Sequence, residues 1–327
     1  MDAHTKEDQH PMLELLRPAV ATREIESLSN AILVALEMSY RGIGVYAYAR
    51  FGKSEAATYL RVHKEWLGRH AAAILSFLSP LADKRTDGSF ASTLLTGLNV
   101  RISSKSTPDE RMQQLASFLI ERCQAANAKL VLIMVDDANR LKPGDYEHLV
   151  TLDNKLTAAG YYLFIVSIFQ RDVTGFTNES VTQSEYPPHV HGRFLVRKHE
   201  FSGVRNIEDL AYYLSRYDDS TEWPAGSGVS YSRHFAPLAF ENGWRLAHEA
   251  PRLWAAAEKL RDASRLPSTW TWPMKSIEGT VAYLLTNVAP NKPDFQGLSD
   301  KDIDTALDAA GYIELELSRH TYAHNGA

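Results

Sequence analysis

The residues from Ala47 to Ser54 combine a glycine, a lysine and a hydroxyl at a spacing that suits polyphosphate binding. They fit the pattern G-x-x-x-x-G-K-[ST], with alanine at the first glycine position. In such a loop, backbone N–H groups and the positive end of the following helix bind phosphates. Gly52 would let the backbone approach the phosphates, Lys53 would reach the β- and γ-phosphates, and the Ser54 hydroxyl would ligate Mg²⁺. The pattern therefore predicts ATP and Mg²⁺ as ligands. The other loop residues of this predicted site are Ala47, Arg50 and Phe51.

A pair of acids, Asp136 and Asp137, follows the apolar run of residues 130–135. A carboxylate at the carboxyl end of a central strand, beside a phosphate loop, is well placed to hold magnesium. We therefore predict that Asp136 supports the ion together with Ser54, and that Asp137 positions or activates the attacking water. The structural alternative for the two motifs is a strand–turn–helix with a surface lysine and a solvated acidic turn.

These side chains need a sheet to bring them together, and the hydrophobic pattern predicts one. Apolar runs alternate with stretches of helical periodicity, which is typical of an α/β fold with a three-layer parallel sheet. A run that is apolar on both faces, such as residues 130–135, suits a central parallel strand. The predicted strands are residues 42–48, 72–77, 130–135, 161–166 and 194–196. The predicted helices among them are residues 26–39, 54–67, 110–126 and 146–158.

The pattern changes after about residue 203, where helical segments follow one another without strands. Three are predicted at residues 206–217, 230–248 and 250–263, and two more at 276–287 and 300–310. Ser299 is the expected N-cap of the last helix and Gly311 its C-terminal stop. The predicted domains are an N-terminal extension (1–25), an αβα core (26–203), a small helical lid (204–265) and a helical tail that binds partners (266–327).

Composition and charge narrow the function classes. The chain has 327 residues, 44% of them hydrophobic and 23% charged, with one cysteine and a net charge of −5. No apolar run reaches the roughly 18 residues that a membrane helix needs, so we expect a cytoplasmic protein. An acidic chain does not wrap DNA by bulk attraction, so any contact with duplex DNA requires a local basic strip. The candidates for backbone contacts, with a solvated loop as the alternative, are Lys84, Arg85, Arg101 and Lys105.

The order of these parts resembles the P-loop ATPases of the AAA+ family. Thr22-Arg23-Glu24 resembles the segment that lies against adenine, and Ser167 or Gln170 follows the fourth predicted strand where the family places a polar sensor. Arg193, in Gly192-Arg193-Phe194, resembles the arginine that reaches the γ-phosphate of a neighbouring subunit. Arg245, in Asn242-Gly243-Trp244-Arg245, resembles the second sensor of the lid.

Within AAA+, residues 15–265 are most similar to the TnsC/TniB-type regulators of DNA transposition. This resemblance implies an ATPase that assembles as a ring or helical filament on duplex DNA and meets a transposase and a target-selection protein. Two departures, Ala47 for glycine and Asp137 for glutamate, imply slow hydrolysis used as an assembly switch. A replication initiator or helicase loader of the same superfamily is the main alternative, and a small-molecule phosphotransferase is the third.

Overall fold

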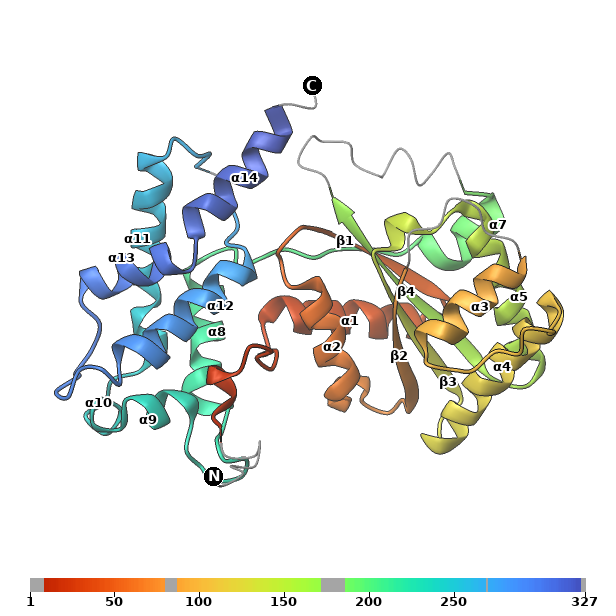
Figure 1. The fold of residues 1–327 in the computed structure, drawn as a ribbon, viewed down its shortest axis with the longest axis horizontal. Helices are drawn as coiled ribbons and strands as arrows, with labels where there is room; N and C mark the ends of the chain where they lie inside the picture. The colour runs from red at the N-terminus through yellow and green to blue at the C-terminus, as the bar shows by residue number, and fades with distance from the viewer. Residues whose placement is uncertain (1–8, 80–86, 172–185, 269, 325–327) are drawn as a thin grey trace. The chain divides into compact units, whose positions relative to one another are not determined.

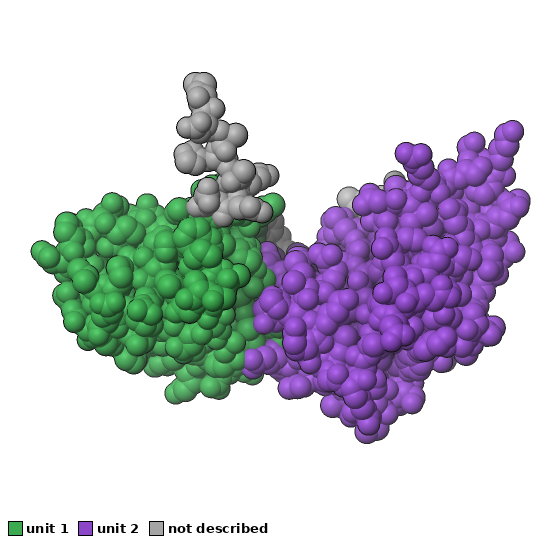
Figure 2. Space-filling model, turned by 90° about the horizontal axis from the view of Figure 1, so that it is seen from below, with its two compact units in different colours: residues 1–25, 50–52, 202–327 green, residues 26–49, 53–201 purple. Residues whose placement is uncertain are grey.

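The computed structural model describes residues 9–79, 87–171, 186–268 and 270–324. By their contacts these residues form two compact units, which Figure 2 shows in different colours. The sheet unit comprises the described parts of residues 26–49 and 53–201. The helical unit comprises those of residues 1–25, 50–52 and 202–327, so three residues of the phosphate loop group with it.

The sheet unit is built on five parallel strands (Figure 1). The central strands are buried almost throughout, as the apolar runs in the sequence require. Parallel pairing places the carboxyl ends of neighbouring strands at one edge, where Tyr48 aligns with Arg171. In spatial order the strands are β2 (Ala72–Leu78), β3 (Leu130–Asp136), β4 (Tyr162–Arg171), β1 (Gly42–Tyr48) and β5 (Lys198–Glu200).

Helices cover both faces of this sheet, which confirms the predicted α/β class with a three-layer arrangement (Figure 1). One core cluster joins the α3, α4 and α5 layer to the sheet, with Leu119, Ile133 and Leu152 almost fully buried in it. A capping box between Thr107 and Glu110 fixes the start of α4. On that face lie α3 (Asp87–Gly97), α4 (Pro108–Ala125) and α5 (Pro143–Ala158), and on the other α1 (Arg23–Glu37) and α2 (Lys53–Val62).

The prediction of a strand at residues 194–196 is wrong. The chain there forms a short helix, α7 (Pro188–Val190), and a π-helical turn, η4 (His191–Leu195), before β5 begins at Lys198. Phe194 and Leu195 are fully buried in the core, and a short buried apolar run does not distinguish a strand from a helical turn. The strand itself is more polar because it pairs on one side only, with β1.

Two predicted helices are shorter than the periodicity suggested. The helix expected over 54–67 ends at Val62 and is followed by a separate turn, η2 (Glu65–Leu67). The helix expected over 230–248 is broken by Pro237, which starts a new helix, and by Gly243, which has a left-handed φ of 93°. The resulting pieces are α9 (Tyr231–Phe235), α10 (Pro237–Glu241) and η5 (Leu246–Glu249).

The helical unit has a single core that extends over both the expected lid and the expected tail. Leu214, Leu253, Trp272 and Leu307 belong to one buried cluster, and Met12 of the N-terminal segment joins it. Ser299 and Asp302 form the capping box of α13, which confirms the predicted N-cap. Besides the pieces above, the elements are η1 (Pro11–Leu13), α8 (Ile207–Asp219), α11 (Ala250–Ala263), α12 (Met274–Tyr283), η6 (Leu284–Val288), α13 (Asp300–Ala309) and α14 (Tyr312–His324).

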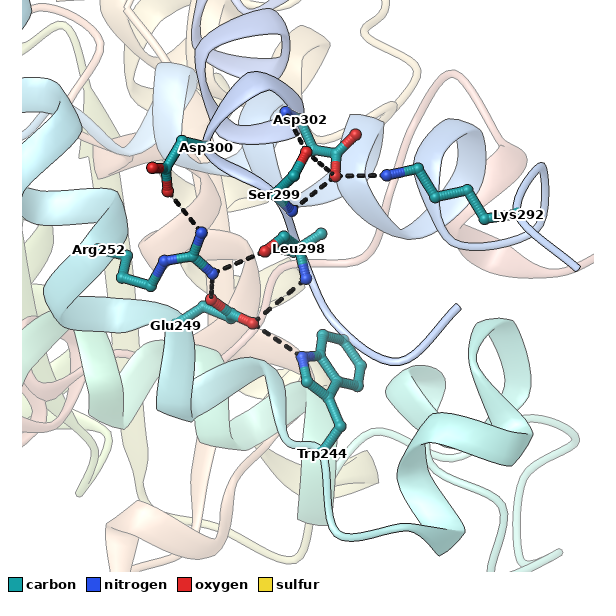
Figure 3. A network of polar contacts seen from close by, with 8 residues as sticks. All are labelled: Trp244, Glu249, Arg252, Lys292, Leu298, Ser299, Asp300 and Asp302. Carbon is teal, nitrogen blue, oxygen red and sulfur yellow. Dashed lines mark hydrogen bonds and ion pairs between the residues drawn. The ribbon is translucent and has the colours of Figure 1, made fainter. Parts of the chain in front are cut away.

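A polar network joins the start of α11 to the start of α13 (Figure 3). The Glu249 carboxylate, which is buried, accepts hydrogen bonds from Trp244 Nε1 at 2.9 Å and from Arg252 Nη1 at 2.8 Å. Arg252 also donates to the Leu298 carbonyl at 2.7 Å and to Asp300. A buried carboxylate requires such partners, so the network fixes how the two helices meet. Within the described residues, no helix combines the length and apolar character needed to span a bilayer.

Candidate nucleotide site

The predicted phosphate loop lies between the end of β1 at Tyr48 and the start of α2 at Lys53. Two of its residues have left-handed backbone conformations, Arg50 with φ of 69° and Gly52 with φ of 88°. Glycine suits the second position, and a Cβ there would also lie 3.3 Å from the Met274 side chain. The strand–loop–helix order that phosphate binding requires is therefore present, with the helix N-terminus directly behind the loop.

Lys53 reaches back over this loop. Its Nζ donates a hydrogen bond to the Tyr48 carbonyl at 3.0 Å, and the side chain is half-buried. Burial lowers the pKa of the Lys53 ammonium from its ordinary value, and attraction to Asp136 and Asp137 partly offsets this effect. A half-buried cation that donates to a neutral carbonyl would gain from a phosphate at this position.

Ser54 and Asp136 meet although 82 residues separate them in the chain. The Ser54 hydroxyl donates to Asp136 Oδ2 at 2.5 Å, and the Asp137 amide donates to Asp136 Oδ1 at 2.9 Å. These hydroxyl and carboxylate oxygens are hard ligands of the kind that Mg²⁺ takes, usually with one or two carboxylates and the phosphates of the nucleotide. The donor set therefore fits the predicted metal, with Ser54 and Asp136 as its protein ligands.

Asp137 is held by an arginine that the sequence did not single out. The residue adopts a left-handed conformation with φ of 51°, and its Oδ2 pairs with Arg140 Nη2 at 2.9 Å. Arg140 also donates to the Ser79 carbonyl, beyond the end of β2, at 3.1 Å. The carboxylate is thus oriented at the edge of the sheet where Asp136 lies, beside the position predicted for the attacking water.

The two sensor candidates on β4 lie in different environments. Ser167 is fully buried and accepts a hydrogen bond from the Tyr146 hydroxyl at 3.0 Å, while burial holds the pKa of Tyr146 well above its ordinary value. Gln170 is exposed at the carboxyl edge, because β4 extends five residues beyond the predicted end at 166. Asn139 holds the Gln170 backbone there, accepting from its amide at 2.6 Å and donating to its carbonyl at 3.0 Å.

Asn139 borders the candidate site, and sequence reasoning missed it. It belongs to η3 (Ala138–Arg140), directly after the acidic pair, and its amide group forms both hydrogen bonds across to β4. A polar residue shortly after a buried strand was the available signal, but the periodicity ended β4 before the segment that Asn139 contacts. These two hydrogen bonds fix the distance between the turn that follows Asp136 and Asp137 and the end of β4 at Gln170.

Arg193 lies away from these groups in the sheet unit. Its Nη1 contacts Asp153 Oδ2 at 3.2 Å and Asn154 Oδ1 at 3.1 Å, and Arg41 pairs with the same Asp153 at 3.5 Å. Burial raises the pKa of Asp153, and the charges of Arg41 and Arg193 partly offset this. Arg41 directly precedes β1, so Arg193 is at the amino edge of the sheet, opposite the edge that carries Asp136.

Arg23 and Arg245 are both engaged within the helical unit. Arg23 pairs with Asp209 at 3.8 Å, and its guanidinium lies 5.2 Å from the centre of the Tyr212 ring. Arg245 donates to the carbonyls of Phe240 and Trp244 at 2.8 and 2.7 Å, and it stacks on the Phe240 ring. In this conformation both cations are already oriented by neighbours on their own unit.

Of the four candidates for DNA contacts, Lys84 and Arg85 lie outside the described residues. Arg101 and Lys105 lie in the segment between α3 and α4, and both side chains are exposed. The Arg101 carbonyl accepts a hydrogen bond from Gln114 Nε2 at 2.8 Å, which ties this segment to α4. Two basic side chains are thus presented on a segment whose backbone is anchored.

No protein-family model matches this sequence, and no curated protein matches it. Solved structures of similar fold include the ADP form of the Aeropyrum pernix ORC2 protein, with a TM-score of 0.46, 13% identity, and coverage of 92% of this chain and 72% of that one. Cdc6p from Pyrobaculum aerophilum gives a TM-score of 0.43 and 11% identity over 96% of this chain and 88% of that one. Domain III of the Thermotoga maritima replication initiation protein DnaA gives a TM-score of 0.33 and 12% identity over 84% of this chain and 95% of that one. These are likenesses of fold, and the chemistry of the site rests on its own geometry.

Proposed function

We propose that the chain is an ATP-dependent switch, a P-loop ATPase of the AAA+ kind that binds ATP with Mg²⁺. The observation that carries the proposal is the 2.5 Å hydrogen bond between Ser54 Oγ and Asp136 Oδ2. It places the hydroxyl of the phosphate loop against the carboxylate that ends the central strand β3. Lys53 lies over the same loop, so a cation, a hydroxyl and a carboxylate converge where a triphosphate and its metal need them.

Each residue then has a defined task. Lys53 and the backbone amides around Gly52 would bind the phosphates, and Ser54 and Asp136 would hold the metal, whose positive charge would offset the negative charge of the phosphates. Asp137, oriented by Arg140, accepts a hydrogen bond from the attacking water. Asn139, through its two hydrogen bonds to the Gln170 backbone, keeps the end of β4 near the proposed site of the attacking water. The shorter side chain of aspartate, compared with glutamate, supports the proposal of slow hydrolysis.

Assembly is the proposed output of the switch. Arg193 occupies the edge of the sheet opposite Asp136, so it does not complete the site of its own copy, and we propose that it contacts the γ-phosphate held by a neighbouring copy. A ligand that binds only at an assembled interface shifts the equilibrium toward assembly by mass action. A ring or filament on duplex DNA would follow, with Arg101 and Lys105 among the backbone contacts.

Two processes are proposed for this switch. Replication initiation or helicase loading agrees with the names of the solved structures of similar fold, although likeness at that level shows the fold alone. Regulation of transposition rests on the resemblance of the sequence motifs. Pull-down from the native host separates the two, because recovery of a replicative helicase supports the first and recovery of a transposase with a target-selection protein supports the second.

The nucleotide site is tested by Lys53→Ala, with Lys64→Ala as the control. Lys64 is an exposed lysine just beyond α2 and lies outside the proposed site. We expect Lys53→Ala to weaken ATP binding, measured by calorimetry with Mg²⁺, by roughly a hundredfold, which is about 2.7 kcal/mol. Lys64→Ala should bind as the parent does. Equal affinities of Lys53→Ala and the parent would refute the site.

The assembly role is tested by Arg193→Ala, with Arg41→Ala as the matched control. Both arginines pair with Asp153, so both variants remove one cation from the same carboxylate. We expect Arg193→Ala to bind ATP normally and to lose the ATP-dependent increase in mass measured by light scattering. Arg41→Ala should keep that increase. If both variants assemble, or if both fail, Arg193 has no role beyond its pair with Asp153.

A further inference from the structure

Three consecutive residues at the tip of the phosphate loop each contact the C-terminal helices. The Arg50 carbonyl accepts a hydrogen bond from the Lys275 amide at 3.3 Å, in the first turn of α12. Gly52 lies so close to Met274 that a Cβ there would be 3.3 Å from its side chain. The guanidinium of Arg319, on α14, lies 5.4 Å from the centre of the Phe51 ring. All six residues belong to the helical unit.

Phe51 is the most unusual of the three. Polyphosphate loops need small residues where the backbone approaches the ligand, and this loop carries a phenylalanine directly before Gly52. The side chain is only 1% exposed, so it serves as an anchor and not as a solvent-facing loop residue. Burial of an aromatic ring is among the strongest single contributions to holding a loop in place. Arg50 beside it has φ of 69°, a conformation that non-glycine residues keep only where surrounding contacts hold them.

The partner of Phe51 is itself rigidly held. Arg319 lies 3.4 Å from Glu316 on the same helix, and Glu316 is fully buried in an ion pair with Arg261 of α11. Arg261 in turn donates to the Pro267 carbonyl at 3.0 Å and lies over the Trp270 ring. Buried charges require partners, and the ion pair with Glu316 keeps Arg319 beside the loop.

We propose that Phe51 is a positioning residue for the nucleotide, that α14 holds it through Arg319, and that α12 holds Arg50 and Gly52 on either side of it. The inference rests on the proposed ATP site and adds that the C-terminal tail sets its affinity. With the tip fixed at Arg50, Phe51 and Gly52, the amides that enter α2 are already oriented when a triphosphate arrives. Preorganisation of this kind lowers the cost of ordering a loop on binding.

Coupling between two sites is reciprocal, so the nucleotide also stabilises the helices that hold the loop. In the parent protein, ATP is expected to slow amide hydrogen exchange in the first turn of α12 and in α14. Without the anchor, ATP would protect the loop and α2 only. A purely structural role of Phe51 would change the stability of the protein and leave both the ATP affinity and this pattern of protection unchanged.

The test uses the full chain with Phe51→Ala, Phe51→Leu and Arg319→Ala, and with Arg122→Ala as the control. Arg122 makes a comparable contact, its guanidinium 4.9 Å from the Phe118 ring on α4, away from the loop. We expect Phe51→Ala to weaken ATP binding about tenfold or more, which is roughly 1.4 kcal/mol or above, and to lose the protection in α12 and α14. Phe51→Leu should restore most of the affinity, Arg319→Ala should fall between the two, and Arg122→Ala should match the parent.

Each outcome has a distinct consequence. If the parent binds ATP and Lys53→Ala does not, but folded Phe51→Ala and Arg319→Ala bind as the parent does, the anchor is refuted while the ATP site stands. If Phe51→Ala is unfolded, Arg319→Ala decides alone, because its half-buried side chain can be shortened without emptying the core. If the parent itself shows no ATP binding, the proposed function fails and the anchor fails with it.

Discussion

Replacing His10 with phenylalanine should make the helical unit less sensitive to acid. His10 is 2% exposed and is surrounded by the rings of Trp223, Tyr231, His234 and Phe235, with centroids 4.5 to 5.1 Å away. Its Nδ1 accepts a hydrogen bond from the Met12 amide at 3.1 Å. Among the described residues its Nε2 has no hydrogen-bond partner. A cationic imidazole in this aromatic cage would lose the accepted bond and remain without an anionic partner.

The magnitude follows from the pKa. Burial lowers the pKa of His10 from 6.5 to about 4, with a smaller contribution from His234. The unfolded chain therefore takes up the proton first, so the free energy of unfolding is unaffected above about pH 6.5 and falls as the pH drops toward 4. The full loss is at most about 3 kcal/mol, and roughly 2 kcal/mol of it is reached by pH 5. His234, whose pKa burial also lowers, contributes with the same sign.

The assay is urea unfolding followed by tryptophan fluorescence at about pH 7.5 and pH 5. Five of the six tryptophans belong to the helical unit and only Trp66 lies in the sheet unit, so the fluorescence signal reports mainly on unfolding of the helical unit. When the pH is lowered from about 7.5 to 5, the free energy of unfolding should fall by roughly 2 kcal/mol more in the parent than in His10→Phe. His63→Phe, which replaces an exposed histidine stacked on Tyr59, should follow the parent. Identical losses in the parent and His10→Phe would refute a buried neutral imidazole.

Three further predictions concern the two units separately. Arg252→Ala should lower the free energy of unfolding by roughly 1–3 kcal/mol, measured by thermal denaturation, because it leaves the buried Glu249 with fewer partners (Figure 3). Asp137→Ala should slow ATP hydrolysis about tenfold or more in a phosphate-release assay and leave ATP affinity nearly unchanged, and an unaltered rate would remove its proposed role. Asn139→Ala should reduce the hydrolysis rate less than Asp137→Ala does, because it frees the Gln170 backbone without removing a reacting group, and a loss of ATP affinity instead would contradict this.

Much of the sheet was predictable because each of its central strands carries its own signal. Residues 42–48 match β1 in full, and the run before Asp136 predicted β3, since strands buried on both faces are apolar throughout. The edge strand β5 has no such signal, because it pairs on one side and has polar residues. The apolar residues Phe194 and Leu195 just before it are buried by a helical turn, which misled the prediction.

The juxtaposition of Ser54 and Asp136 was predictable for a different reason. Parallel strands bring their carboxyl ends to one edge of the sheet, so the loop and helix that follow β1 lie at the same edge as the acid that ends β3. Ser54 in α2 can therefore meet Asp136 despite their separation in the chain. Asn139 and Arg140 act one turn later, where the backbone leaves the strand through a left-handed Asp137, and no periodicity specifies which way such a turn directs its side chains. Their roles depend on the folded structure of this turn.

No local pattern in the sequence predicts the contact of Phe51 with Arg319, because it depends on α11 and α14 meeting at the buried pair of Arg261 and Glu316. This arrangement constrains how a partner bound to the C-terminal tail could act. The tail shares one core with the preceding helices, so a partner cannot detach it without unfolding that core. A partner that engages α14 would therefore alter the nucleotide site by shifting Arg319 relative to Phe51, and its effect should disappear in Phe51→Ala.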